Sequence, residues 1–151
     1  MARSAMQSGS ADSGLDLQTL DRGECLRLLE QGVIGRVVYT AGAMPAAQPV
    51  NYAMDGDEII FRTEGGTKME LAVTNAVVAF EIDEIDVNTR SGWSVLAVGE
   101  AYHISNPDRI GSLQSRIPQP WAAGRSVYTI AIPTTQLTGR RLQSVDAPVG
   151  P

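Results

Sequence analysis

The sequence predicts a mainly β domain of the α+β class, built as a small antiparallel barrel of six to seven strands with flanking helices. Short β-branched or alternating segments follow one another at close spacing, and hairpin-type turn signals such as Asp55-Gly56-Asp57 separate them. Helical segments are too few to supply the crossovers of a doubly wound parallel sheet. A chain of 151 residues is also the size of a single domain.

Three segments begin with a helix-capping signal. The pairs Asp21–Glu24 and Thr67–Glu70 each place a carboxylate three residues after a capping side chain, which is the spacing of a capping box. Asn106 followed by Pro107 is a cap with a proline in the first helical position. The expected helices cover residues 21–32, 67–75 and 108–117.

The other periodic segments favour β-strands, because their apolar residues alternate or are β-branched. One of them contains Pro49, and proline cannot donate a ladder hydrogen bond. That strand therefore belongs at a sheet edge or beside a bulge. The predicted strands cover residues 33–40, 46–54, 58–63, 76–85, 93–104, 126–133 and 136–142.

Charge and the chain ends limit the possible functions. The formal net charge of −5 opposes non-specific binding to nucleic acid. No apolar run approaches the about 20 residues of a membrane span, and the polar N-terminus lacks the apolar core of a secretory signal. We therefore expect a cytoplasmic protein with no nucleic-acid or membrane partner. The expected organisation is a disordered leader over residues 1–14, one folded barrel domain over 15–145 and a disordered tail over 146–151.

The cysteine and histidine content excludes two classes of site. One cysteine, Cys25, allows no internal disulfide, and one histidine, His103, allows no Cys/His zinc cluster. Cys25 lies on the apolar stripe of the first helix, which is typical of an inert buried thiol. A structural or surface role is favoured for His103 over a catalytic one.

The segment FRTEGGTKME is the most informative for function. Arg62 and Thr63 end a strand, two glycines allow a sharp bend, and Lys68 lies in the first turn of a helix. A helix N-terminus offers unpaired N–H groups and the positive end of the helix dipole, so with two nearby cations this is a candidate anion site. The alternative is a surface arginine and lysine beside an ordinary turn.

Two further segments place polar groups at strand ends or edges. In SGWSVLAVGEA, two serines bracket a tryptophan, and Gly99 would allow a bulge or the close approach of a flat group. In PVNY, an asparagine and a tyrosine can recognise a heteroaromatic edge. Each segment has a structural alternative, a core or rim tryptophan in the first and an ordinary edge strand in the second. The residues concerned are Pro49, Val50, Asn51, Tyr52, Ser91, Trp93 and Ser94.

Taken in order, the motifs PVNY, FRTEGGTKME, VAFEID, SGWSVLAVGEA and TGRRL resemble the pyridoxamine 5′-phosphate oxidase-like flavoproteins. More narrowly, they are similar to the actinobacterial branch related to nitroimidazole-resistance reductases. The resemblance covers about residues 17–142. It implies a split β-barrel homodimer that holds FMN, or a related deazaflavin coenzyme, in a groove between the subunits.

The resemblance also implies roles for single residues. The arginine, threonine and lysine of FRTEGGTK would hold the flavin phosphate, the PVNY strand would lie along the isoalloxazine ring, and the SGWS residues would reach the phosphate, ribityl chain or ring edge. A late aromatic loop would meet the flavin of the other subunit. The C-terminal Arg and His set of true pyridoxamine-phosphate oxidases is not found, so pyridoxal-phosphate synthesis is not expected. The implied cofactor-binding residues are Pro49, Val50, Asn51, Tyr52, Phe61, Arg62, Thr63, Lys68, Ser91, Trp93, Ser94 and Trp121, with Arg125 as a further candidate.

The function implied is that of a flavin-dependent oxidoreductase, which transfers a hydride or electrons between FMN and a small organic acceptor. Hydride transfer is the chemistry of the cofactor, so no catalytic side chain and no metal site is assigned. The alternatives are a non-catalytic flavin- or haem-binding module, a deazaflavin-dependent reductase on the same fold, and a structural dimerisation domain without a ligand. The expected partners are a second copy of the chain and a small-molecule acceptor.

Overall fold

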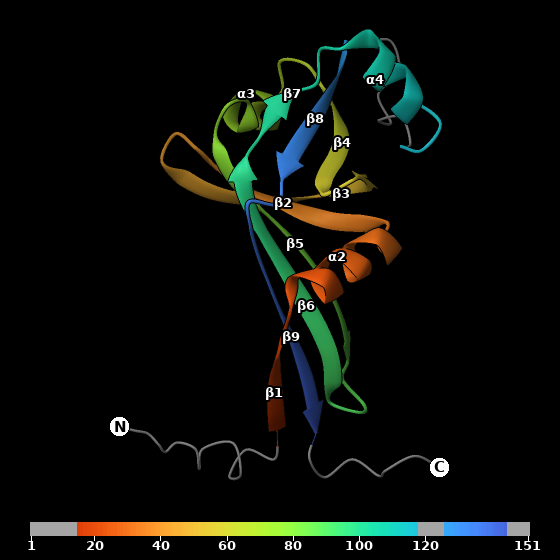
Figure 1. Cartoon of the computed structure of the whole chain (residues 1–151). Coiled ribbons are helices and arrows are strands. Elements are labelled where there is room, and N and C mark those ends of the chain that lie inside the picture. Colours follow the sequence, from red (N-terminus) through yellow and green to blue (C-terminus); the bar gives the residue numbers. More distant parts are fainter. Residues whose placement is uncertain (1–14, 118–125, 145–151) are drawn as a thin grey trace.

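The computed structural model describes residues 15–117 and 126–144, and within them nine antiparallel strands form one continuous sheet (Figure 1). Their spatial order is β1-β9-β6-β5-β2-β3-β4-β8-β7. This confirms the predicted mainly β class. The strands are β1 (Leu15–Leu20), β2 (Ile34–Ala41), β3 (Met44–Asp55), β4 (Glu58–Glu64), β5 (Val77–Asp86), β6 (Ser91–Glu100), β7 (Tyr102–His103), β8 (Val127–Pro133) and β9 (Gln136–Ser144).

The described part of the chain contains three helices, α2 (Arg22–Gln31), α3 (Lys68–Val73) and α4 (Pro107–Leu113). All three begin where the capping signals predict, because the caps are local in sequence. The side chain of Asp21 accepts from the backbone N–H of Glu24 at 2.8 Å. The expected reciprocal bond from Glu24 is not formed, since its carboxylate binds Arg27 and Arg141 instead. None of these helices has both the length and the apolar character needed to span a bilayer.

Two strands were not predicted, so the described part of the chain has nine strands where six to seven were expected. β1 pairs along β9, and this partner lies more than a hundred residues away in the sequence. The expected strand over residues 93–104 is split into β6 and β7. At the break, the backbone N–H of Ala101 donates to the carbonyl of Ala76, and the chain then joins the other half of the sheet beside β8. The predictions for residues 1–14 and 146–151 lie outside the described residues.

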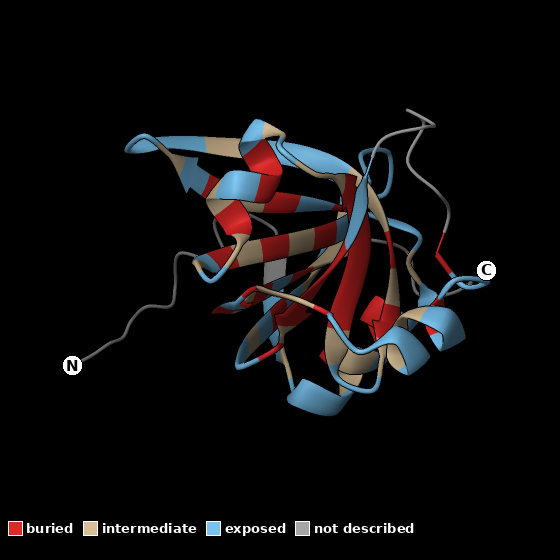
Figure 2. Ribbon diagram, turned by 90° about the horizontal axis from the view of Figure 1, so that it is seen from above, coloured by how far each residue is buried: buried red, intermediate tan, exposed pale blue. Residues whose placement is uncertain are grey.

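The sheet folds into a split barrel because β3 changes partner along its length. Residues 44–51 pair with β2, whereas residues 52–55 pair with β4. The first half of β3 therefore has a free edge, and Pro49 lies there, as the sequence predicts. A main core fills the inside of the sheet beneath α2 and α3, and a smaller second core lies beneath α4. Figure 2 shows buried residues along the strands and exposed residues on the outer faces of the helices.

Four strands continue beyond the barrel as an arm. β5 pairs with β2 only over Ala79–Glu81, so the second half of β5 extends past β2 together with β6, β9 and β1. In Figure 1 the β5–β6 hairpin marks one end of the molecule, whereas β4 and α3 lie at the other. This arrangement separates the motifs that the sequence places in one site.

Candidate functional site

The side chain of Arg62 is buried on β4, with 8% of its surface exposed. Successive strand residues point to opposite faces, so Arg62 lies on the side of Ile60, in the second core, and not on the side of Phe61. Among the described residues its guanidinium forms no ion pair, and its Nη1 is a buried atom without a hydrogen-bond partner. A buried cation without a counter-ion is unfavourable unless an anion binds to it. The residue therefore fits the phosphate-binding role that the sequence predicts.

Thr63 and Phe61 point to the face of β4 opposite to that of Arg62. Phe61 is fully buried in the main core, so direct contact with a ligand would require the core to open. Thr63 is 6% exposed and pairs across the sheet with Tyr128 of β8. Strand alternation thus places Arg62 and Thr63 on opposite faces of β4, and their shared contact with one phosphate stays a prediction.

Lys68 is the exposed first residue of α3. It lines an open groove of about 520 Å³ between α3 and the β2–β3 hairpin, together with Thr40, Ala41, Gly42, Leu71 and Ala72. In the part of the chain that the structure describes, its ammonium group makes no ion pair. The lysine is therefore available to an anionic ligand.

Two backbone N–H groups at the turn before α3 and in its first turn donate to side chains of the same segment. The Thr67 hydroxyl oxygen accepts from the backbone N–H of Glu70 at 3.1 Å, and Glu70 Oε1 accepts from the backbone N–H of Gly66 at 2.8 Å. The predicted capping box is thus present, with its return bond shifted by one residue. The backbone N–H groups of Gly66 and Glu70 are therefore already used, and an anion at this turn would not receive their hydrogen bonds.

A polar cluster joins α3 to β7. Glu70 Oε2 lies 3.0 Å from His103 Nε2, and the Thr74 hydroxyl lies 3.0 Å from the same nitrogen. The His103 ring stacks on Tyr128 with the ring centroids 4.7 Å apart. His103 is therefore a half-exposed, hydrogen-bonded residue, in agreement with the structural role favoured from the sequence. The hydrogen bond from Gly66 is the main cause that lowers the pKa of Glu70.

The lowered pKa of Glu70 predicts a pH dependence of stability. A depressed pKa in the folded state contributes stability that is present above the unfolded value of 4.5 and is lost as the pH falls through the folded value. Glu70→Gln should lower the free energy of unfolding by about 1 kcal/mol at pH 7, and the difference from the parent should shrink below about pH 4. Urea unfolding of both proteins at several pH values measures this. An unchanged difference at low pH would contradict it.

The PVNY residues lie on β3 with different exposures. Pro49 is exposed, Val50 and Asn51 are half-buried, and Tyr52 is buried. The Tyr52 hydroxyl donates to the carbonyl of Leu29 at 2.6 Å, and its ring packs edge-on against Phe80. Burial raises the pKa of Tyr52 to about 12. The polar group of this tyrosine already fixes the end of α2, so among the four residues Asn51 is better placed to meet a ligand.

The SGWS residues lie in the arm, far from β4 and α3 (Figure 1). Trp93 packs against the edge of the main core, whereas Ser94 points to the outer face of the sheet, in register with Asp83 and Arg140. Ser91 bonds to the hydroxyl of Thr89 at 2.6 Å. One chain therefore does not bring these residues to Arg62 and Lys68. Trp121 and Arg125 lie outside the described residues.

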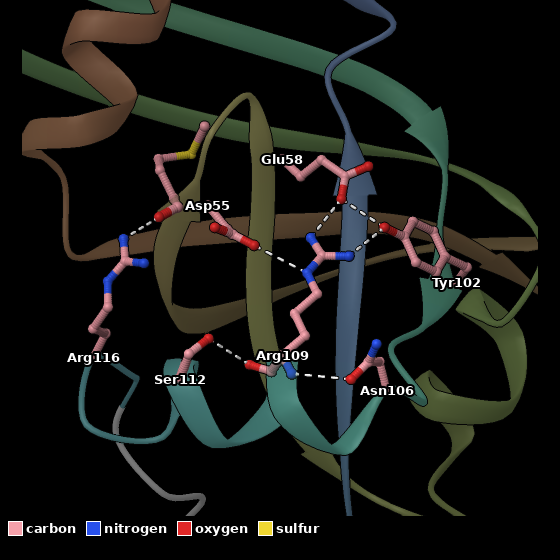
Figure 3. Close-up of polar contacts among 8 residues, drawn as sticks. Asp55, Glu58, Tyr102, Asn106, Arg109, Ser112 and Arg116 are labelled. Atoms are coloured by element: carbon pink, nitrogen blue, oxygen red, sulfur yellow. Dashed lines mark hydrogen bonds and ion pairs between the residues drawn. The ribbon is translucent and has the colours of Figure 1, made fainter.

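The sequence reasoning missed a charged network that holds α4 in place (Figure 3). Arg109 donates to Asp55 at 3.0 Å, to Glu58 at 2.7 Å and to the Tyr102 hydroxyl at 2.9 Å. The hydrogen bond to Glu58 is the main cause that raises the pKa of Arg109, and burial raises that of Tyr102. The partners are far apart in sequence, so no local signal could have revealed the network. One of its members, Tyr102, also packs against the second core, which contains Ile60.

Replacing Arg109 should remove the ion pairs that join α4 to Asp55 and Glu58. Arg109→Met leaves two neighbouring half-buried carboxylates without their shared cation, and we expect a loss of about 1–3 kcal/mol in unfolding free energy. Urea unfolding provides the measurement. Arg27→Met is the control, since its ion pair with Glu24 lies at the surface of α2. Equal losses in the two variants would contradict the assigned role.

Comparison with known proteins identifies the family. A family model described as pyridoxamine 5′-phosphate oxidase matches residues 21–144. The chain belongs to this family. An uncharacterized protein of Mycobacterium tuberculosis, Rv0080, is 36% identical over 138 residues, which cover 88% of this chain and 90% of that protein.

Solved structures agree with the assignment. The structure of an FAD binding protein from Mycobacterium smegmatis is 32% identical, covers 82% of this chain and 98% of its own, and has a TM-score of 0.71. A candidate pyridoxamine 5′-phosphate oxidase of Corynebacterium glutamicum is 27% identical and has a TM-score of 0.72. The match covers 85% of this chain and 99% of that protein's chain. A candidate 5-nitroimidazole resistance protein of Bacteroides thetaiotaomicron, 14% identical over 85% of this chain and 89% of its own, shares the fold with a TM-score of 0.68. The resemblance stated from the motifs is confirmed at the level of the family.

Proposed function

We propose that this chain binds a flavin through Arg62 and works as a flavin-dependent oxidoreductase. The observation that carries the proposal is the buried Arg62 guanidinium, which has an orphaned Nη1 and no counter-ion among the described residues. A flavin phosphate is an anion that would satisfy it by charge-assisted hydrogen bonds. Membership of the pyridoxamine 5′-phosphate oxidase family and the FAD binding protein of M. smegmatis support a flavin as the ligand.

We take FMN as the cofactor to test first, because its terminal phosphate matches an arginine with a free guanidinium nitrogen. FAD and a deazaflavin coenzyme share the ribityl phosphate, so the same residues would contact them. A bound flavin would supply hydride or electron transfer to a small organic acceptor. The protein's part is to hold the phosphate with Arg62 and Lys68, and to place Asn51 near the ring.

A second copy of the chain is part of the proposal. Arg62 and Lys68 lie at one end of the molecule and Ser91, Trp93 and Ser94 in the arm at the other, so one ligand can meet both groups only if two chains contribute. The outer face of the sheet is also suited to a partner. Closed twofold dimers are the commonest assembly of soluble proteins.

That outer face carries a row of apolar side chains. Val38, Ala79 and Val98 are adjacent on β2, β5 and β6, and Leu96, 41% exposed, extends the row. The buried apolar residues of α2 and α3 pack in the main core, on the opposite face of the sheet. Sedimentation should therefore give about twice the 16.1 kDa of one chain at micromolar concentration. A stable monomer would contradict the homodimer.

The proposed function is tested by the small molecule that the purified protein carries. Denaturation should release a compound whose mass identifies FMN, FAD or a deazaflavin, and the intact protein should show flavin absorbance. Protein that is colourless and takes up none of the three would overturn flavin binding. Reduction by NAD(P)H or a reduced deazaflavin, followed by reoxidation by an added acceptor, separates an enzyme from a flavin- or haem-binding module without turnover.

A further inference from the structure

Glu64, the last residue of β4, has a buried carboxylate oxygen, Oε2, without a hydrogen-bond partner among the described residues. Its backbone, in contrast, is well held. Glu64 pairs with Val127 of β8, and its carbonyl accepts from the Thr67 hydroxyl at 3.0 Å. Buried polar side-chain atoms are nearly always hydrogen bonded, so an orphaned carboxylate oxygen on a fixed backbone requires a physical reason.

The same face of β4 carries the orphaned atom of Arg62. Residues two apart on a strand point to the same side, with about 7 Å between their Cα atoms. The two side chains have opposite charges, yet they form no ion pair with each other. Glu64 is half-buried and Arg62 keeps 8% of its surface exposed, so both residues lie close to the surface at the end of β4.

A ligand that satisfies both atoms must present two different groups side by side. Arg62 needs an oxyanion, and Glu64 needs a hydrogen-bond donor, because a carboxylate accepts hydrogen bonds and repels a second anion. A phosphate next to an alcohol has this pattern. An inorganic phosphate dianion alone does not, since it would meet the Glu64 carboxylate as well as the arginine.

We propose that Glu64 binds a hydroxyl of the ribityl chain beside the phosphate that Arg62 holds. This inference rests on the proposed flavin function and adds a residue that recognises the sugar-alcohol part of the cofactor. Lys68 and the groove beside α3 are not needed for it. Arg62 would bind the phosphate, and Glu64 would bind the hydroxyl.

Three flavins separate the two contacts. Lumiflavin has the ring without a ribityl chain, riboflavin adds the chain, and FMN adds the phosphate. Binding of each is measured by quenching of flavin fluorescence with the cofactor-free full chain, its Glu64→Leu and Glu64→Gln variants, and Arg62→Met. Glu30→Leu, which changes an exposed carboxylate on α2, is the matched control. Circular dichroism confirms that each variant is folded.

The expected pattern is specific. Glu64→Leu should weaken riboflavin and FMN by the same factor, about 10- to 150-fold, and leave lumiflavin unchanged. Glu64→Gln, which keeps an acceptor oxygen, should lose less affinity for riboflavin and FMN than Glu64→Leu. Arg62→Met should weaken the binding of FMN and leave the binding of riboflavin and lumiflavin unchanged. Riboflavin binding that is equal in Glu64→Leu and the parent would overturn the inference, as would an equal loss for lumiflavin. A parent that binds none of these three flavins, and neither FAD nor a deazaflavin coenzyme, overturns the proposed function itself.

Discussion

Replacing Arg62 with methionine should weaken FMN binding by about 10- to 150-fold, because charge-assisted hydrogen bonds to a phosphate are worth about 1.5–3 kcal/mol. The same change should leave the cofactor-free protein at least as stable as the parent. Arg62 is buried without a counter-ion, so methionine, of similar length, removes an unfavourable charge while keeping the packing. Titration with FMN and thermal unfolding of the flavin-free protein measure the two effects.

Lys68→Ala should weaken FMN binding less than the Arg62 variant. A lysine acts as a point charge, whereas the planar guanidinium can hold two phosphate oxygens, and Lys68 is exposed to solvent. Arg27→Met is the control for both, because that arginine pairs with Glu24 on the surface of α2. Arg22 is unsuitable for this purpose, since it donates to the carbonyl and the hydroxyl of Thr134 and so helps to hold α2 in place.

Opposite outcomes are informative. FMN affinity that is unchanged in the Arg62 variant would move the phosphate site elsewhere. A flavin-free variant that loses stability by several degrees would make Arg62 a structural residue.

Gly99→Ala should destabilise the protein by about 3 kcal/mol, which corresponds to a fall of roughly 6–12 °C in Tm for a chain of this size. The close approach that the sequence predicts at Gly99 is real, but the approaching group is backbone. A Cβ atom at Gly99 would lie 2.0 Å from the carbonyl oxygen of Pro133. A backbone carbonyl cannot move aside as a side chain can, so β8 or β6 would have to shift.

A matched glycine distinguishes this steric effect from the general cost of changing glycine. Gly111 lies within α4, and a Cβ there would meet nothing within 4 Å. Gly111→Ala should therefore stabilise the protein by up to about 1 kcal/mol, since alanine favours the helix. Differential scanning calorimetry of both variants provides the comparison. Similar losses in the two would show that the Pro133 contact does not decide the effect.

Much of the fold follows from local signals. The capping residues Asp21, Thr67 and Asn106 mark the first turns of all three described helices, because a cap needs only the next two or three residues. The alternating segments become strands close to the predicted limits. β1 is the exception, since it is a strand only through its pairing with β9.

The candidate site could be predicted less completely. The motif FRTEGGTK correctly singles out Arg62, whose burial without a counter-ion the structure then reveals. Strand alternation places Thr63 on the other face, and Tyr52 uses its hydroxyl for α2. Glu64 carries no motif of its own. Glu64 becomes a candidate ligand-binding residue only because the folded chain buries one of its carboxylate oxygens without a hydrogen-bond partner.

The sequence by itself determined the mainly β class, the helix starts, the position of the proline on a free strand edge and the family, because these depend on neighbouring residues and motif order. Only the tertiary structure decided which strands are adjacent, that Arg109 of α4 binds Asp55 and Glu58, and that the SGWS motif lies at the opposite end of the molecule from Arg62. These features depend on contacts between residues far apart in the chain. Such contacts form when apolar surfaces are buried together, and no local pattern specifies them.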